Sequence, residues 1–111
     1  MKPETKDTPI VCDMNVFTPV ERESHIRATT QLFQNVQGIH EVERGYEFNF
    51  SNSNEAVIIT QLAEFISNER RCCPFLGFTL RISPNKLISL LLTGPEGTQE
   101  FLREEFSEVF S

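Results

Sequence analysis

The chain has 111 residues with 16 acidic and 10 basic side chains, which give a formal net charge of −6. This length fits one domain with a core of its own, and the acidic excess opposes nucleic-acid binding, which depends on cationic side chains that displace counterions from phosphates. No apolar run approaches the roughly 18 residues of a membrane-spanning helix, so we expect neither nucleic acid nor a membrane as a partner.

The N-terminal residues 1–9 are polar and include two prolines and charges of both signs. They predict a flexible tail before a single domain over residues 10–111, and they lack the basic and apolar stretches of a secretory signal. We therefore expect a cytoplasmic protein. In a reducing compartment its three cysteines persist as thiols, metal ligands or redox groups, so we expect no disulfide scaffold.

The first helix is predicted by the segment Thr18–Glu21, which has the pattern of a capping box. The hydroxyl can accept a backbone N–H, and the glutamate can reach back to the start of the helix. Gly38 offers a stop, so we expect helix from about Pro19 to Asn35. Its predicted apolar side consists of Ile26, Leu32, Phe33 and Val36.

Two segments alternate apolar and polar side chains and predict β-hairpins. The first spans Ile39–Phe50 and turns at Arg44-Gly45, and the second joins Leu76–Ile82 to Lys86–Leu92. The apolar face of the first hairpin consists of Tyr46, Phe48 and Phe50.

A helix is predicted after each hairpin, from apolar residues at spacings of three and four. The second helix follows Ser51–Asn54 and must end near Cys72, because Pro74 disfavours helical backbone before it and has no N–H to donate. The third is predicted to start at a capping box over Thr93–Glu96. The apolar residues are Val57, Ile58, Leu62, Phe65 and Ile66 in the second helix, and Phe101, Leu102, Phe106, Val109 and Phe110 in the third.

The predicted order is therefore helix, hairpin, helix, hairpin, helix. Because each hairpin has one apolar face that needs cover, we expect an α+β fold with a four-stranded, mainly antiparallel sheet covered by helices. The order of the strands does not follow from the pattern.

The most suggestive chemistry lies in the segment Glu69–Phe75, which reads ERRCCPF. Helical spacing places Glu69 on the apolar stripe of the second helix, with Cys72 or Cys73 three to four residues further on the same side. We expect the Glu69 carboxylate to lean toward the cysteines and to form a structural ion pair with Arg70 or Arg71.

Adjacent cysteines suggest a site for a thiophilic metal ion, since thiolates favour Zn, Cu(I) and similar ions. The candidate ligands are Cys72 and Cys73, because Pro74 frees the second cysteine from the helix, together with Cys12 as the remaining thiol. No thiol or imidazole lies at a diagnostic spacing from the pair. The alternative is that the cysteines are small buried hydrophobic residues at the end of an amphipathic helix.

The sequence gives no positive support for an enzyme, because no spacing places a general base beside a thiol. His25 and His40 are interpreted as packed or exposed histidines. The segment Thr93–Gly97 lacks the lysine and glycine spacing of a phosphate-binding loop, and capping explains it better.

Several segments together resemble a family of small uncharacterised bacterial proteins, some of which occur near heavy-metal or mercury-resistance genes. The resemblance covers roughly residues 10–105, and Glu69–Phe75 is its most specific part. It implies that Cys12 belongs to one pattern with the cysteine pair, and it favours metal binding without supplying a mechanism. The other matching segments are Phe78 with Leu80, Leu92–Gly97 and Phe101 with Leu102.

Two functions follow as hypotheses. The first is a soft-metal or thiol-binding accessory protein that uses the vicinal pair Cys72 and Cys73, with Cys12 as a further ligand. The second is a noncatalytic small-ligand or protein-binding module with structural cysteines, in which Phe75 and Phe78 line a cleft or a homodimer surface.

Overall fold

The computed structural model describes residues 9–51, 53–85 and 87–110. It confirms the α+β class and the four-stranded antiparallel sheet. Apart from Pro9, the predicted tail lies outside the described residues, as does Lys86 of the predicted second hairpin. In the part of the chain that the structure describes, no helix is both long and apolar enough to cross a bilayer.

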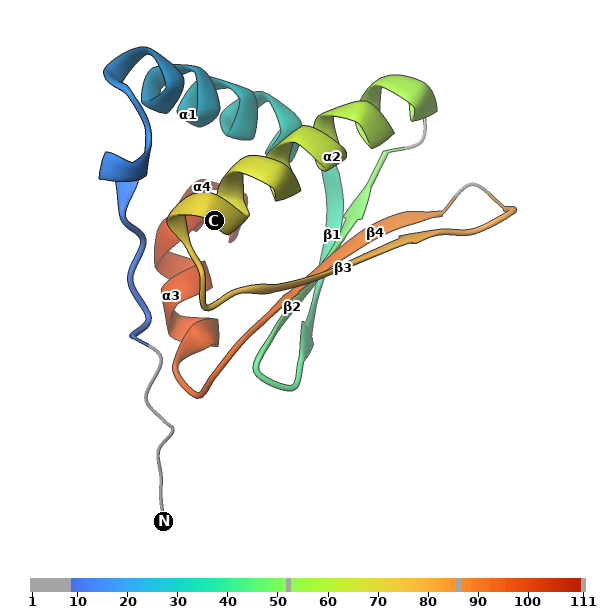
Figure 1. Cartoon of the computed structure of the whole chain (residues 1–111). Coiled ribbons are helices and arrows are strands. Elements are labelled where there is room, and N and C mark those ends of the chain that lie inside the picture. Colours follow the sequence, from blue (N-terminus) through green and yellow to red (C-terminus); the bar gives the residue numbers. More distant parts are fainter. Residues whose placement is uncertain (1–8, 52, 86, 111) are drawn as a thin grey trace.

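Figure 1 shows the elements in chain order, from a short 3-10 helix near the N-terminus to two short helices at the C-terminus. Compared with the predicted order, the additions are the 3-10 helix and the division of the C-terminal helix into two. The elements are η2 (Met14–Val16), α1 (Pro19–Phe33), β1 (Val36–Val42), β2 (Gly45–Phe50), α2 (Glu55–Cys72), β3 (Gly77–Ile82), β4 (Ile88–Thr93), α3 (Thr98–Glu105) and α4 (Ser107–Phe110).

Helix α1 begins at the predicted capping box. The Thr18 hydroxyl accepts the Glu21 N–H at 3.1 Å, and the Glu21 carboxylate accepts the Thr18 N–H at 2.9 Å. The helix ends at Phe33, two residues earlier than predicted, because Val36 already pairs with β2 as a strand residue. The predicted apolar side was wrong at Ile26, which is 52% exposed; the buried positions are His25, Leu32 and Phe33.

The capping box predicted at Thr93–Glu96 is contradicted. Thr93 is the last residue of β4 and pairs with both neighbouring strands, so its backbone continues the sheet. Helix α3 instead starts at Thr98, after Gly97 with a left-handed φ of +100°. A left-handed backbone is inexpensive only for glycine, which explains why this residue makes the turn from sheet to helix.

The sheet has the strand order β1-β2-β4-β3, and every neighbouring pair is antiparallel. Phe48 lies opposite Leu90, and Leu90 lies opposite Leu80, so the inward side chains form continuous rows across the sheet. A register shift between Val36 and Gly38 also brings Ile39 opposite Phe48.

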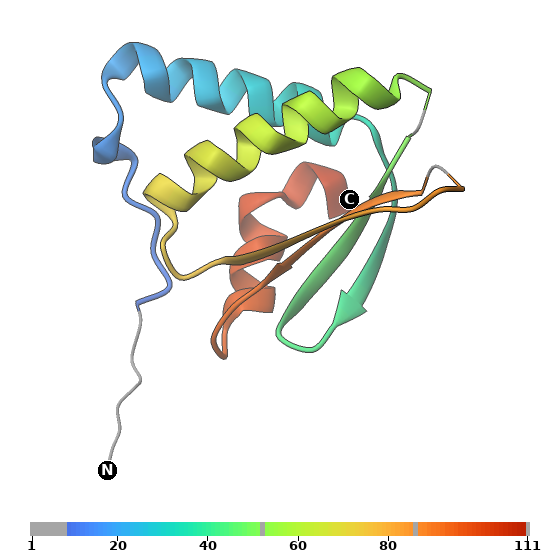
Figure 2. The same ribbon diagram turned by 45° about the vertical axis from the view of Figure 1, so that its right-hand side comes forward.

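Aromatic rings join the helices to this apolar face. The Phe33 ring of α1 contacts that of Phe48 at a centroid distance of 5.3 Å, and the Phe65 ring of α2 contacts that of Phe78 at 6.4 Å. Phe106, which follows α3, stacks on Phe33 at 4.5 Å. In Figure 2, α1 and α2 run side by side, and the segment before α1 passes the C-terminal end of α2. The candidate site lies at that end.

The close approach of β2 to β4 gives a test of the register. A Cβ on Gly45 would lie 1.9 Å from the Leu92 carbonyl oxygen, whereas a Cβ on Gly38 would meet nothing closer than 3.5 Å. We expect Gly45→Ala to lower the free energy of unfolding by at least about 2 kcal/mol, and Gly38→Ala to change it by less than about 1 kcal/mol. Urea unfolding of both variants measures the difference, and equal stabilities would contradict the β2–β4 register.

Candidate functional site

The end of α2 turns two adjacent cysteines toward each other. Cys72 is the last helical residue, and Cys73 leaves the helical conformation with φ −123° and ψ 73° while its N–H still bonds the Glu69 carbonyl at 2.8 Å. Side chains of neighbouring residues in a regular helix diverge by about 100°. Because the backbone breaks before Pro74, the two sulfurs instead lie 3.5 Å apart.

The third cysteine reaches this point because the N-terminal segment docks on the end of α2. The Asp13 N–H donates to the Cys72 carbonyl at 2.7 Å, and the Arg71 guanidinium donates to the Val16 carbonyl at 3.0 Å. The same guanidinium lies 4.7 Å above the Phe17 ring, which adds a cation–π contact. These contacts place Cys12 against the cysteine pair.

Cys12 and Cys73 form a disulfide across a sequence separation of 61 residues, and Cys72 is the free, buried thiol. The expectation that the cysteines form no disulfide is therefore wrong for this structure. The pairing arises from the docking of two distant segments, which no local spacing reveals. All three sulfurs nevertheless converge, as the metal hypothesis requires.

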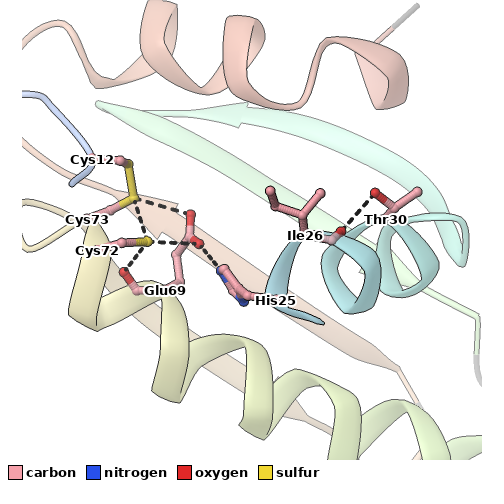
Figure 3. A network of polar contacts seen from close by, with 7 residues as sticks. All are labelled: Cys12, His25, Ile26, Thr30, Glu69, Cys72 and Cys73. Carbon is pink, nitrogen blue, oxygen red and sulfur yellow. Dashed lines mark hydrogen bonds and ion pairs between the residues drawn. A yellow bond between two sulfur atoms is a disulfide. The ribbon is translucent and has the colours of Figure 1, made fainter. Parts of the chain in front are cut away.

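Glu69 leans toward the cysteines, as helical spacing predicts (Figure 3). Its side chain is 3% exposed, with Oε2 3.5 Å from the Cys73 sulfur and Oε1 3.7 Å from the Cys72 sulfur. The predicted ion pair with Arg70 or Arg71 is not formed, since Arg70 is exposed and Arg71 lies near Glu21 at 3.8 Å.

The actual partner of this carboxylate is His25 from α1, whose Nε2 lies 2.9 Å from Glu69 Oε1. The imidazole is 6% exposed and packs between the rings of Phe17 and Phe65. It lies seven residues before Leu32 on the inward stripe of α1, and this heptad spacing is the signal that could have revealed it. His40 is exposed on β1 and takes no part.

Burial and the nearby negative charge of Glu69 hold the free thiol in its protonated form. Burial raises the pKa of Cys72 to about 12, and the negative charge and hydrogen bond of Glu69 act in the same direction. Burial also raises the pKa of Glu105, with a further contribution from the Glu69 charge and an opposing one from His25. The site therefore concentrates negative charge and favours any species that adds positive charge.

A compact donor set results. One ligand atom each from Cys12, Glu69, Cys72 and Cys73 lies within 4.8 Å of the others. Once the disulfide is reduced, these residues offer three sulfurs and one oxygen, which fits the tetrahedral, sulfur-rich coordination of Zn²⁺ and other thiophilic ions. In the disulfide form only the Cys72 thiol can become a thiolate ligand.

A cavity of about 370 Å³ opens beside this cluster, between α1 and the C-terminal helices. Phe75 and Phe78, which the sequence suggested for a cleft, do not line it; Phe75 packs on Phe101 at 4.9 Å and Phe78 packs on Phe65. The lining residues are Met14, His25, Ile26, Thr29, Thr30, Phe33, Gln34, Glu69, Glu105, Phe106, Ser107, Glu108 and Val109.

Comparison with known proteins adds no relative to this description. No protein-family model matches the chain, and neither a curated protein nor a solved structure matches it.

The raised pKa of Cys72 makes stability depend on pH in a defined direction. The native state keeps the Cys72 proton up to about pH 12, whereas the unfolded thiol loses it near the ordinary value of 9.0. This contribution to stability is thus fully present below about pH 9 and is lost as the pH rises toward 12. We expect the free energy of unfolding to fall more steeply above pH 9 in the wild type than in Cys72→Ala, by up to about 1.4 kcal/mol per pH unit. If urea titrations gave the same dependence of the unfolding free energy on pH in both proteins, the loss of stability above pH 9 would not come from Cys72.

Proposed function

We propose that the reduced protein is a soft-metal-binding accessory protein in which Cys72, Cys73 and Cys12 hold a thiophilic ion. The observation that supports this function most directly is the convergence of the three sulfurs and the Glu69 carboxylate within 4.8 Å. The ligands would be thiolates from two distant segments and the Glu69 carboxylate from α2. Soft sulfur donors therefore outnumber the single hard oxygen donor.

The electrostatics of the cluster supports the same conclusion. Three thiolates beside Glu69 would bring four negative charges into a buried space, which is very unfavourable without compensation. Burial is the main reason for the raised pKa of Cys72, and the second is the negative charge of Glu69, which a bound divalent cation would offset. Binding must displace thiol protons, so metal affinity should rise with pH.

His25 has the position of a residue that orients a metal ligand. Its Nε2 holds Glu69 Oε1 at 2.9 Å, while the Phe17 and Phe65 rings fix the imidazole. Hydrogen bonds of this kind set the direction of a ligating carboxylate and strengthen the metal site. The imidazole contacts Oε1, and the other carboxylate oxygen, Oε2, faces the Cys73 sulfur.

The proposal requires a reducing compartment, in agreement with the cytoplasmic location expected from the sequence. Reduction of the Cys12–Cys73 disulfide by two electrons and two protons frees both thiols, and only then is the full donor set present. The resemblance of the Glu69–Phe75 segment to bacterial proteins near heavy-metal resistance genes supports the choice of a soft ion.

A second candidate is a noncatalytic small-ligand or protein-binding module with structural cysteines. The cavity of about 370 Å³ beside Phe33 and Phe106 favours a small ligand, since it falls within the usual size of ligand pockets. In this case the Cys12–Cys73 disulfide is a structural link, and closing a loop of 61 residues would contribute about 4 kcal/mol of stability.

Thermal melts of the protein, reduced with a phosphine, distinguish the two functions. We expect a few equivalents of Zn²⁺ or Hg²⁺ to raise the midpoint by several degrees, because an ion that binds only the native state stabilises it by mass action. The rise should vanish in Cys72→Ser and in Cys73→Ser, and in the oxidised wild type it should be much smaller. An unchanged midpoint in the reduced wild type, with both variants merely less stable, would favour the ligand-binding module.

The role of Glu69 has a matched control on the same helix. We expect Glu69→Gln to weaken Zn²⁺ affinity by roughly 10- to 100-fold, because the amide keeps the shape but removes the charge that faces the sulfurs. Glu64→Gln, at an exposed position one turn earlier, should bind as the wild type does. Competition with a chromogenic chelator measures both affinities, and equal weakening in the two variants would assign the effect to net charge alone.

A further inference from the structure

We infer that the cavity between α1 and the C-terminal helices is the access route of the ion, with Glu105 and Glu69 as successive oxygen ligands on the way to the sulfurs. The inference rests on the proposed metal binding and adds to it the path and the residues that guide the ion.

Two of the three cysteines need such a path because they are shielded from solvent, whereas Cys12 is half-buried. Cys72 is 1% exposed and Cys73 is 0% exposed. The N-terminal segment packs beside them through the Asp13 N–H bond to the Cys72 carbonyl and through the Arg71 bond to Val16. An ion therefore reaches Cys72 and Cys73 either through the cavity or by displacement of this segment, which carries Cys12.

Glu69 joins the cavity to the cluster. Its side chain lines the cavity, while its two carboxylate oxygens lie 3.5 and 3.7 Å from the sulfurs of Cys73 and Cys72. An ion held by a Glu69 oxygen is consequently one ligand exchange away from a thiolate. Figure 3 shows the carboxylate between the two cysteines and the His25 ring, which belongs to the cavity wall.

The remaining wall suits a cation that carries water. Glu105 adds a second carboxylate, and Met14 adds a thioether, which is a soft donor. The Thr29 hydroxyl oxygen is buried and has no hydrogen-bond partner among the described residues, so a polar occupant would satisfy it. With about 30 Å³ for each water, an ion with six waters needs roughly 200 Å³, which fits in the cavity of about 370 Å³.

The two routes predict different effects of substitution. If the cavity is used, a bulky residue at half-buried Val109 obstructs the path, and removal of the Glu105 charge weakens the attraction for the approaching ion. If the N-terminal segment is displaced instead, neither change matters. Arg71→Ala would then accelerate access, because it removes the bond to Val16 and the contact with Phe17.

Rapid mixing of the reduced 111-residue protein with Cd²⁺ tests the route, since cadmium–thiolate charge-transfer absorbance reports arrival at sulfur. We expect Val109→Trp and Glu105→Gln to slow the absorbance change at least tenfold, with Val109→Trp reaching the wild-type amplitude. The matched controls Val57→Trp, on exposed α2 surface, and Glu104→Gln, beside Glu105 but outside the cavity wall, should keep the wild-type rate.

The possible failures are distinguishable. Wild-type rates in both cavity variants, or faster binding in Arg71→Ala, would overturn the access route and leave the metal site in place. No absorbance change in the reduced wild type would overturn the metal site and the route together. Circular dichroism of each variant before mixing shows whether it is folded, and the conservative Glu105→Gln keeps the test valid if Val109→Trp fails to fold.

Discussion

The candidate site depends on one break in one helix. Pro74 cannot continue α2, so Cys73 leaves the helix, its sulfur turns toward that of Cys72, and the Cys72 carbonyl accepts the Asp13 N–H. Together with the bond from Arg71 to Val16, this bond anchors the N-terminal segment where Cys12 meets Cys73. Without the break, two adjacent cysteines on a regular helix would diverge, and no common ligand could contact both.

The second constraint is the burial of Glu69. A carboxylate that is 3% exposed needs a partner, and the structure provides His25 on one side and the Cys72 thiol, with the Cys73 sulfur beside it, on the other. The arrangement stabilises the carboxylate but makes thiolate formation at Cys72 unfavourable, since the pKa of that thiol rises to about 12. The Cys72 thiol therefore stays protonated and unreactive until a bound cation or a change of redox state alters the charge of the cluster.

Much of the local structure could be predicted because it depends on near neighbours. The Thr18 capping box, the end of α2 before Pro74 and the alternation of Tyr46 and Phe48 are each fixed within a few residues. The same reasoning failed at Thr93, where pairing with strands on both sides outweighed a capping pattern. It also missed the pairing of His25 with Glu69: the heptad spacing of His25 before Leu32 indicates an inward position on α1, but no local spacing identifies a partner 44 residues away.

Periodicity and proline chemistry act over one or two turns, so they were enough to predict the α+β class, the four strands and a cysteine pair beside a leaning glutamate. The strand order, the pairing of Cys12 with Cys73 and the cavity beside Glu69 could be found only in the folded chain. These features arise where segments far apart in the chain dock on one another. Such contacts are selected by the burial of shared apolar surface, which leaves no pattern in the local spacing of residues.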